Sequence, residues 1–377
     1  MIEALEPGSR LRAWLAERRF VWYNRGDIGK TISFSRCDNG PGRFHCCPAL
    51  MQGERIGRMK PPEIAGLIAV GLTAAVAVIA ARVAARYRRE IRAARDRLHS
   101  LGSQLIETKC GPVEYATHGE GYPVLVVHGI FGGFDQGLVI ARGNVGEGFY
   151  SIAPSRFGYL RTPLPDDASP AGQADAFACL LDALNIQKAA ILGTSAGGTS
   201  AIQFALRHPN RCSALVLFAS NAPGEAEATL PPKPLAEALF KSDFIFWEAI
   251  TYFSSNLTSM LGVPDGFELT PRYQADVAEV LQTILPVNPR ADGALFDMFV
   301  SNPDVNTGYP LEEIAVPVLI INAVDDPLAL YENAQAAAAR ISGSKLVTIE
   351  SGGHMMLGHE ERIRSEIAAF LEEHASN

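Results

Sequence analysis

Residues 189–207 read AAILGTSAGGTSAIQFALR, and this stretch decides the fold class. Its apolar beginning, residues 189–192, predicts a buried strand, and the periodic pattern of residues 196–207 predicts a helix. Between them stands Gly193-Thr194-Ser195-Ala196-Gly197. A G-x-S-x-G string alone occurs by chance. Between a strand and a helix, however, it predicts a nucleophile elbow, a strained turn whose small residues allow close packing while Ser195 projects beyond the sheet.

The residues that would activate such a serine follow later in the chain. A serine hydroxyl is a weak nucleophile at neutral pH, and it needs a base within hydrogen-bond reach that a third group orients. Asp325-Asp326-Pro327 comes shortly after an apolar predicted strand, so a carboxylate lies just past the carboxyl end of that strand, on the same rim as Ser195. We predict Asp326 as the acid, with Asp325 as the alternative.

The base is predicted to be His354. It follows a predicted strand over residues 345–349, and the glycines of Gly352-Gly353-His354 free the loop to bring the imidazole inward. With a base and an acid available, an ordinary strand-to-helix turn with Ser195 as helix N-cap becomes the weaker interpretation. The other histidines are less suited, because they lie before the domain, in a strand, beside helices or at the tail: His45, His99, His118, His128, His208, His359 and His374.

Two main-chain groups are predicted to form an oxyanion hole. His128 ends an apolar strand and opens the loop HGIFGG, so we interpret it as a residue that shapes this loop. The N–H groups of Ile130 and Ala196 would hold the negative oxygen of a tetrahedral intermediate, and the helix that begins near Ala196 favours negative charge at its N-terminus. The residues predicted to support this geometry are His128, Gly129, Gly193 and Gly197.

Short β-rich runs alternate with helical runs from about residue 103 onward. This alternation predicts an α/β fold with an eight-stranded, mostly parallel sheet flanked by helices. Strands are expected over residues 104–109, 113–118, 123–128, 150–153, 189–192, 214–218, 316–321 and 345–349, and helices over 171–184, 196–207, 330–341 and 360–373.

The alternation stops between residues 221 and 311. About ninety residues without structure are improbable in a compact domain, so we expect a helical cap over the carboxyl edge of the sheet. Most of its aromatic residues should form the core of the cap, and the remainder could line an apolar pocket. The aromatic residues concerned are Phe240, Phe244, Phe246, Trp247, Tyr252 and Phe253.

An N-terminal transmembrane helix is predicted from residues 64–81, which contain no charge. Eighteen residues span about 27 Å at 1.5 Å per residue, close to the roughly 30 Å thickness of the hydrocarbon layer. A cleaved signal peptide is the competing interpretation, but its apolar region usually has only about 7 to 15 residues, and here arginines follow at once. We therefore predict a retained single-pass anchor.

The side of the membrane follows from the basic residues that flank this span. Seven arginines lie downstream within about 20 residues, against four basic residues upstream. The positive-inside rule then places the catalytic part in the cytoplasm. Met59 directly precedes Lys60-Pro61-Pro62 and the span, so we also consider translation starting there or at Met51.

These patterns divide the chain into five segments. They are an N-terminal extension that is predicted to be poorly ordered (1–62), a membrane anchor with a basic juxtamembrane helix (63–100), a first part of the core (101–221), the helical cap (222–311) and a second part of the core (312–377).

Charge and cysteine content exclude several kinds of partner. Residues 1–100 carry a net charge of +9 and residues 101–377 a net charge of −17, so the catalytic part lacks the basic face that nucleic acid requires. The cysteines show no framework spacing, and we expect buried free thiols. Cys37, His45, Cys46 and Cys47 lack the paired spacing of a zinc site, so no metal is predicted.

Taken together, the ordered Ser, Asp and His with the His-Gly loop resemble the α/β-hydrolase superfamily over about residues 104–375. The Gly-Gly-His sequence and the inserted cap look like its lidded esterase, lipase and carbon–carbon bond hydrolase branch. Where many members carry D-R-x-G-x-G, this chain has Ser155-Arg156-Phe157-Gly158-Tyr159. Because of this departure, the resemblance does not predict the local surface that these residues form. A serine in place of an aspartate argues against haloalkane dehalogenase and epoxide hydrolase chemistry.

The resemblance implies acyl transfer through an acyl-enzyme on Ser195, with no metal or organic cofactor. An apolar cap beside a membrane anchor favours small hydrophobic esters, including lipids, as substrates. Thioesters and carbon–carbon cleavage of ring-derived diketones are alternatives that use the same three residues. A ligand-binding or signalling protein on this fold is another. A dinucleotide-dependent oxidoreductase is disfavoured, because the chain lacks G-x-G-x-x-G.

Overall fold

The computed structural model describes residues 60–224, 230–254 and 257–374, and the chain divides into two compact units, Met1–Ile79 and Ala80–Asn377. The predictions about the N-terminal extension, the cysteine cluster around Cys46 and the start of translation lie outside the described residues.

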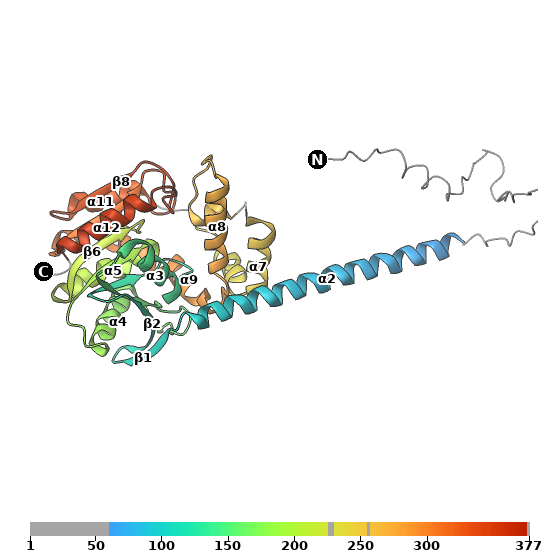
Figure 1. Ribbon diagram of the computed structural model, residues 1–377, viewed down its shortest axis with the longest axis horizontal. Coiled ribbons are helices and arrows are strands. Elements are labelled where there is room, and N and C mark those ends of the chain that lie inside the picture. The colour runs from blue at the N-terminus through green and yellow to red at the C-terminus, as the bar shows by residue number, and fades with distance from the viewer. Residues whose placement is uncertain (1–59, 225–229, 255–256, 375–377) are drawn as a thin grey trace, which may run out of the picture. The chain divides into compact units, whose positions relative to one another are not determined.

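The predicted membrane span lies within one helix, α2 (Pro61–Ser100), drawn from blue to cyan in Figure 1. An 18-residue window of this helix has a mean hydropathy of 2.5, and none of the window is buried. Large apolar side chains such as Leu67 and Val70 are exposed by 61% and 68%. Length and composition therefore make α2 a candidate membrane span.

An eight-stranded sheet forms the centre of the second unit, as the sequence predicts. Its order is β1-β2-β4-β3-β5-β6-β7-β8, with β2 antiparallel to both of its neighbours and all other pairs parallel. The strands agree with the predicted ones to within two residues: β1 (Gln104–Thr108), β2 (Gly111–His118), β3 (Tyr122–Val127), β4 (Phe149–Pro154), β5 (Ala189–Thr194), β6 (Cys212–Phe218), β7 (Val318–Ala323) and β8 (Lys345–Ile349).

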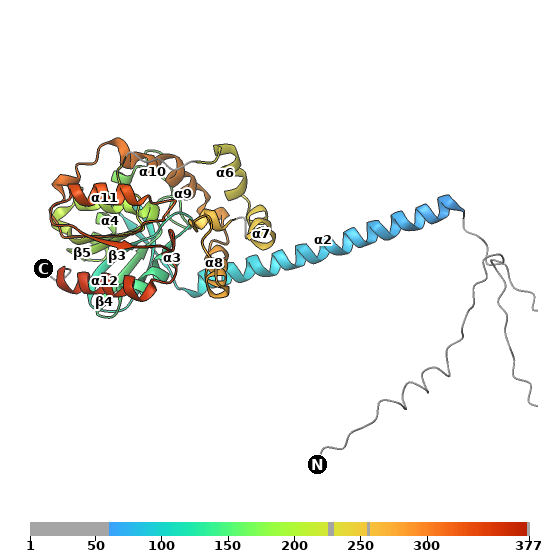
Figure 2. The same ribbon diagram turned by 90° about the horizontal axis from the view of Figure 1, so that it is seen from above.

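The central strands are apolar on both faces, and helices cover each face. In β3, Leu125 and Val127 pack into one core cluster while Val124 and Val126 pack into another. This period of two explains how one strand serves two cores. The first face is covered by α4 (Pro170–Ala183), α5 (Gly198–Arg207) and α11 (Tyr331–Arg340), and the second by α12 (Glu360–His374) and the end of α3 (Phe134–Ile140) (Figure 2).

The segment between β6 and β7 is helical and has its own apolar cluster. Its longer helices are α6 (Lys233–Phe240), α7 (Asp243–Tyr252) and α8 (Pro271–Thr283), followed by the short α9 (Ala291–Phe296) and α10 (Asn302–Asp304). Of the six aromatic residues considered from the sequence, Phe240, Phe246 and Trp247 are buried, whereas Phe244, Tyr252 and Phe253 are exposed.

One prediction about the cysteines is wrong. Cys110 and Cys179 form a disulfide with a Cα–Cα distance of 6.0 Å, although 69 positions separate them in the sequence. Cys110 lies in the turn between β1 and β2, and Cys179 lies on α4, which packs against that hairpin. The sequence could not indicate this pairing, because only the fold brings the turn and the helix together. Cys212 is free and buried, as expected.

Candidate active site

Ser195 lies in the turn between β5 and α5 with a φ of 50°. Such a φ is uncommon for a residue with a side chain and is characteristic of a nucleophile elbow. The neighbouring glycines leave no room for larger residues. A Cβ atom on Gly193 would lie 2.6 Å from the Cβ of Ala201, and one on Gly197 would lie 2.5 Å from the main-chain oxygen of His128. The G-x-S-x-G pattern thus serves a packing requirement.

Of the three residues predicted as a triad, His354 lies within hydrogen-bond distance of both Ser195 and Asp326. Nε2 of His354 is 2.9 Å from Oγ of Ser195, and Nδ1 of His354 is 2.8 Å from Oδ2 of Asp326. The Asp326 side chain is fully buried, and the His354 side chain is 15% exposed. A serine, an imidazole and a buried carboxylate in this order can activate a hydroxyl group.

The carboxylate of Asp326 is held by main-chain groups as well as by the imidazole. Its Oδ1 atom accepts hydrogen bonds from the N–H groups of Leu328 at 2.8 Å and Ala329 at 2.9 Å. These two donors fix the carboxylate, so the orientation of the imidazole is fixed in turn.

Asp325 has a different place. Its carboxylate accepts hydrogen bonds from the N–H groups of Gly352 at 3.1 Å and Gly353 at 2.9 Å. It therefore holds the loop that carries His354 rather than the imidazole itself. Of the two aspartates considered from the sequence, the structure brings Asp326 to the histidine.

A residue of the cap also holds the histidine loop, and sequence reasoning did not identify it. The N–H of His354 donates to the main-chain oxygen of Gly262 at 2.9 Å. Gly262 has a φ of 67°, and a Cβ atom there would lie 2.3 Å from the Cβ of His354. Only glycine satisfies both requirements, the left-handed backbone and the close approach.

The loop that was predicted to carry an oxyanion donor lies beside Ser195. A Cβ atom on Gly129 would lie 2.9 Å from the Cβ of Ser195, which places the following residue, Ile130, next to the elbow. Ala196 is the second residue of the short 3₁₀ turn that precedes α5. The residues of the two predicted donors therefore lie close to the serine.

His128 is buried and fully hydrogen-bonded. Its Nδ1 atom is 2.7 Å from the main-chain oxygen of Gly129, and its Nε2 atom accepts from the N–H of Arg156 at 3.0 Å. These partners require a neutral ring with the proton on Nδ1. Burial lowers the pKa of His128 well below its ordinary value, and the charge of Arg156 adds to this effect. A neutral ring with both nitrogens engaged shapes the loop and is not free to act as a base.

A buried arginine from the cap holds the same loop, and sequence reasoning did not identify it. Arg290, which is 1% exposed, donates from Nη1 to the main-chain oxygens of Phe131 and Gly132. Its guanidinium also forms two hydrogen bonds to the carboxylate of Asp135, at 3.0 and 2.8 Å. Arg290 therefore connects the cap to the residues that directly follow Ile130.

The charge of Arg290 also affects Asp135. Burial by itself raises the pKa of a carboxyl group, but the adjacent guanidinium outweighs burial and lowers the pKa of Asp135 below its usual value. Asp135 is therefore ionised at neutral pH, and the pair is a buried ion pair between the core and the cap.

The segment that departs from the D-R-x-G-x-G pattern makes a second buried connection to the cap. The guanidinium of Arg156 and the hydroxyl of Tyr159 both donate to the carboxylate of Asp297. Ser155 is also buried, and its Oγ accepts from the N–H of Phe134 at 3.1 Å. The segment is therefore buried in the interior, a placement that the sequence pattern did not predict.

Apolar side chains of the cap reach the loop beside Ser195. The ring of Phe131 packs edge-on against Phe240 with 4.7 Å between centroids, and it also contacts Phe246. Ile130 and Met355 lie at the edge of the same cluster. The site is therefore bordered on the cap side by aromatic and aliphatic groups.

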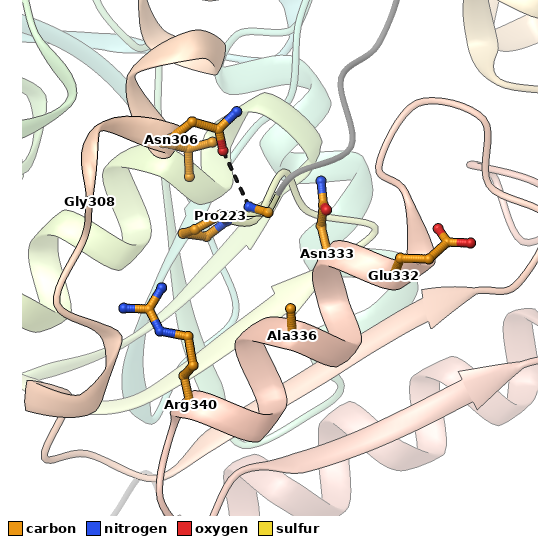
Figure 3. Close-up of a pocket in the computed structure, with 9 residues that line it drawn as sticks. Pro223, Asn306, Gly308, Glu332, Asn333, Ala336 and Arg340 are labelled. Carbon is orange, nitrogen blue, oxygen red and sulfur yellow. Dashed lines mark hydrogen bonds between the residues drawn. The ribbon is translucent and has the colours of Figure 1, made fainter.

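A separate cavity of about 570 Å³ lies between the end of β6 and α11 (Figure 3). Two of its polar groups have partners outside the cavity lining or within it. The N–H of Gly224 donates to Asn306, and the Arg340 guanidinium pairs with Glu312 and the main-chain oxygen of Tyr309. None of the residues that line this cavity belongs to the predicted site. Within the described residues, no cluster of three His, Cys, Asp or Glu side chains could hold a metal ion.

Comparison with known proteins agrees with this fold. The family model described as alpha/beta hydrolase fold matches residues 122–360. The chain is 29% identical to the uncharacterized hydrolase YcgS of Bacillus subtilis over 282 residues, 70% of this chain and 95% of that protein. It is 30% identical over 214 residues to a pimeloyl-[acyl-carrier protein] methyl ester esterase of Neisseria meningitidis, 54% of this chain and 74% of that one.

A further relative and a solved structure extend the comparison. Over 111 residues the chain is 35% identical to a 2-hydroxymuconate semialdehyde hydrolase of Pseudomonas putida, which is 27% of this chain and 37% of that protein. An alpha/beta hydrolase fold protein from Nakamurella multipartita superposes with a TM-score of 0.62 at 28% identity, covering 73% of this chain and all of that one.

Proposed function

This chain belongs to the α/β-hydrolase family, and from that premise we propose that it hydrolyses carboxylic esters through an acyl-enzyme on Ser195. The observation that carries the proposal is the hydrogen-bonded series Ser195, His354 and Asp326. A hydrolase of this family needs an activated nucleophile, and Ser195 is the hydroxyl that lies beside a base with a buried acid behind it.

The proposed reaction has two halves. Oγ of Ser195 attacks the ester carbonyl while Nε2 of His354 takes the hydroxyl proton, and the same proton then passes to the leaving alcohol. Water next attacks the acyl-enzyme, with His354 again accepting a proton, and the acid and the free serine are released. Throughout, the Nδ1 proton stays between His354 and Asp326, whose charge stabilises the imidazolium.

The negative oxygen of each tetrahedral intermediate would be held by the N–H groups of Ile130 and Ala196. Removal of one such donor typically costs about 3 to 4 kcal/mol of transition-state stabilisation. In this proposal Arg290 is a positioning residue, because it holds the carbonyl groups of the residues that follow Ile130.

The substrate is proposed to be an ester with an apolar acyl group. Support comes from the aromatic cluster around Phe131 beside the elbow, and from the Neisseria relative, whose name describes a methyl ester esterase. Carbon–carbon bond hydrolysis is the second candidate, since the Pseudomonas relative is named as a 2-hydroxymuconate semialdehyde hydrolase.

We also propose that α2 crosses a membrane through residues 64–81. The basic flanks and the disulfide favour different sides of that membrane for the catalytic unit. The basic flanks predict a cytoplasmic catalytic unit, whereas the disulfide between Cys110 and Cys179 is typical of an oxidising compartment. A disulfide persists only where reductants are scarce, while the excess of basic residues is a small bias. We therefore favour the oxidising side.

This assignment can be tested by alkylating thiols in intact cells before lysis. The proposal predicts that Cys110 and Cys179 resist alkylation until a reductant is added. Free, alkylated Cys110 in untreated cells would restore the cytoplasmic prediction.

The activity is tested with the full-length chain in detergent micelles, using p-nitrophenyl esters of increasing acyl length. Turnover of esters, with a preference for longer acyl chains, is expected. Turnover of 2-hydroxymuconate semialdehyde in the absence of ester hydrolysis would favour the second candidate. If no ester, thioester or such diketone is turned over, a ligand-binding role on this fold becomes the better account.

A further inference from the structure

The second half of α2 packs against the cap. The Tyr87 ring lies 5.1 Å from that of Phe244 and 5.4 Å from that of Trp247. The indole N–H of Trp247 donates to Glu90 at 2.8 Å, and Ile91 is 6% exposed within the apolar cluster of the cap. From Ala80 onward, therefore, α2 is part of the catalytic unit and not a free tether.

Helix α7 runs antiparallel to this part of α2, as three pairs of residues show. Its first residue, Asp243, faces Arg95 at 3.5 Å, and its last residue, Tyr252, lies beside Arg86, whose guanidinium carbon is 5.9 Å from the ring centroid. Trp247 contacts Glu90 between them. The end of α7 thus points back along α2 toward Ala81, where the predicted span stops.

Helix α7 is apolar around most of its circumference, but only one side of it is covered. Phe246, Trp247 and Ile250 are buried in the cap. On the other side Ile245 is 47% exposed and Tyr252 is 50% exposed, and Phe253, directly after the helix, is 60% exposed. A helix that is apolar all round normally has apolar surroundings all round. The uncovered side of α7 therefore lacks an apolar neighbour.

The level at which the end of α7 lies beside α2 indicates what that neighbour is. Arg86 comes five residues after Ala81, which is about 7.5 Å along a helix. The headgroup layer on each side of a bilayer is about 5 to 7.5 Å thick, so Arg86 lies at its outer edge. If the hydrocarbon layer ends at Ala81, then Tyr252 and Phe253 lie at the level of the headgroups, where aromatic side chains are enriched.

The charges at this level match a phospholipid surface. The residues of α2 that follow Ala81 are rich in arginine, and phosphate groups bind arginine well. The arginines that are exposed here are Arg82, Arg86, Arg88, Arg89 and Arg92.

We propose that the end of α7, formed by Tyr252 and the following Phe253, docks into the headgroup layer of the bilayer that α2 crosses. This inference rests on the proposed membrane span of α2. It assigns the cap a second role, since a cap held against the bilayer receives hydrophobic esters directly from the lipid phase rather than from water.

Photo-crosslinking of the full-length chain tests this docking. The photoreactive residue p-benzoylphenylalanine replaces Phe253 in one variant, Val76 in a second and Val139 in a third, and each protein is reconstituted in vesicles of phosphatidylcholine with phosphatidylglycerol. Val76 lies in the span, whereas Val139 is 63% exposed on α3 and serves as the matched apolar control. Phospholipid adducts at positions 76 and 253, but not at 139, are expected by mass spectrometry.

The outcomes separate the docking from the proposals on which it rests. Adducts at position 76 without adducts at 253 would overturn the docking while leaving the membrane span intact. Adducts from position 253 to a second copy of the chain, or to another protein, would also overturn it. If neither position yields lipid adducts, both the span and the docking are wrong, whereas ester hydrolysis in micelles would stand unaffected.

A kinetic measurement provides a second readout. The double variant Tyr252→Ser, Phe253→Ser should hydrolyse a water-soluble p-nitrophenyl ester at the rate of the unmodified protein. It should hydrolyse a long-chain ester dissolved in the vesicles several-fold more slowly. Equal loss on both substrates, or no loss on either, contradicts the docking.

Discussion

Nε2 of His354 lies 2.9 Å from Oγ of Ser195, although 159 positions separate the two residues in the chain. The parallel sheet accounts for this proximity. Ser195 follows β5 and His354 follows β8, so both lie at the carboxyl edge of the same sheet. The position of His354 depends on the loop after β8, and Asp325 and Gly262 hold that loop through main-chain hydrogen bonds.

The two adjacent aspartates should have separable roles. Asp326→Asn removes the charge that orients His354, so kcat for ester hydrolysis should fall by roughly 10⁴-fold with little change in stability. Asp325→Asn weakens the hold on Gly352 and Gly353, and it should lower the free energy of unfolding by about 1 to 3 kcal/mol with a smaller loss of kcat. Kinetics and urea unfolding of both variants check this assignment. A larger loss of kcat in Asp325→Asn would reverse it.

Arg290 should matter for both stability and catalysis. Arg290→Met leaves the buried Asp135 carboxylate without its main partner, and a broken buried pair typically costs about 3 to 5 kcal/mol. The double variant Arg290→Met, Asp135→Leu removes both charges and should recover much of that stability. Its kcat should stay low, because the main-chain oxygens of Phe131 and Gly132 still lack their donor. Recovery of both properties would mean that Arg290 has no positioning role.

The same pair predicts a dependence on pH. The pKa of Asp135 is lower in the folded protein than in the unfolded chain, so the pair adds stability above the unfolded value near about 4. That contribution is lost as the pH falls through the folded pKa. Between about pH 6 and pH 3, the free energy of unfolding should therefore fall more steeply for the natural chain than for the Arg290→Met, Asp135→Leu variant. Parallel curves would show that Asp135 has an ordinary pKa.

A soluble fragment that begins at residue 80 should be more stable to heat than one that begins at residue 101. A fragment of residues 80–377 keeps the part of α2 that packs on the cap, whereas a fragment of residues 101–377 loses Glu90, Ile91 and Arg97. Both fragments contain Trp247 as their single tryptophan. The shorter fragment should unfold at a lower temperature and show red-shifted tryptophan emission. Identical emission spectra and melting temperatures would indicate that α2 does not contribute to the cap.

Much of this fold could be predicted, because its signals are local. Strands of four to eight apolar residues, the elbow around Ser195 and the glycines before His354 each carry their information within a few positions. The parallel topology then brings the ends of β5, β7 and β8 to one edge, so the residues that follow these strands were expected to meet.

The remaining features depend on contacts between distant segments. The disulfide joins Cys110 and Cys179 only because α4 lies against the first hairpin. Arg290 is one of many arginines in the sequence, and nothing beside it indicates that its partner is Asp135. The packing of α2 on the cap was likewise hidden. A basic juxtamembrane helix was predicted up to residue 100, but nothing in its sequence indicates that Tyr87 and Ile91 join the apolar cluster of the cap.

The most direct test of the central claim is labelling of the full-length protein with a fluorophosphonate, which reacts readily only with an activated serine. We expect labelling at Ser195, none in Ser195→Ala, and labelling slower by orders of magnitude in His354→Ala. His118→Ala, which changes an exposed histidine at the end of β2, should label at the normal rate. If Ser195 remains unlabelled in the natural chain, or if His354→Ala labels equally fast, the account of Ser195 as a nucleophile activated by His354 is contradicted.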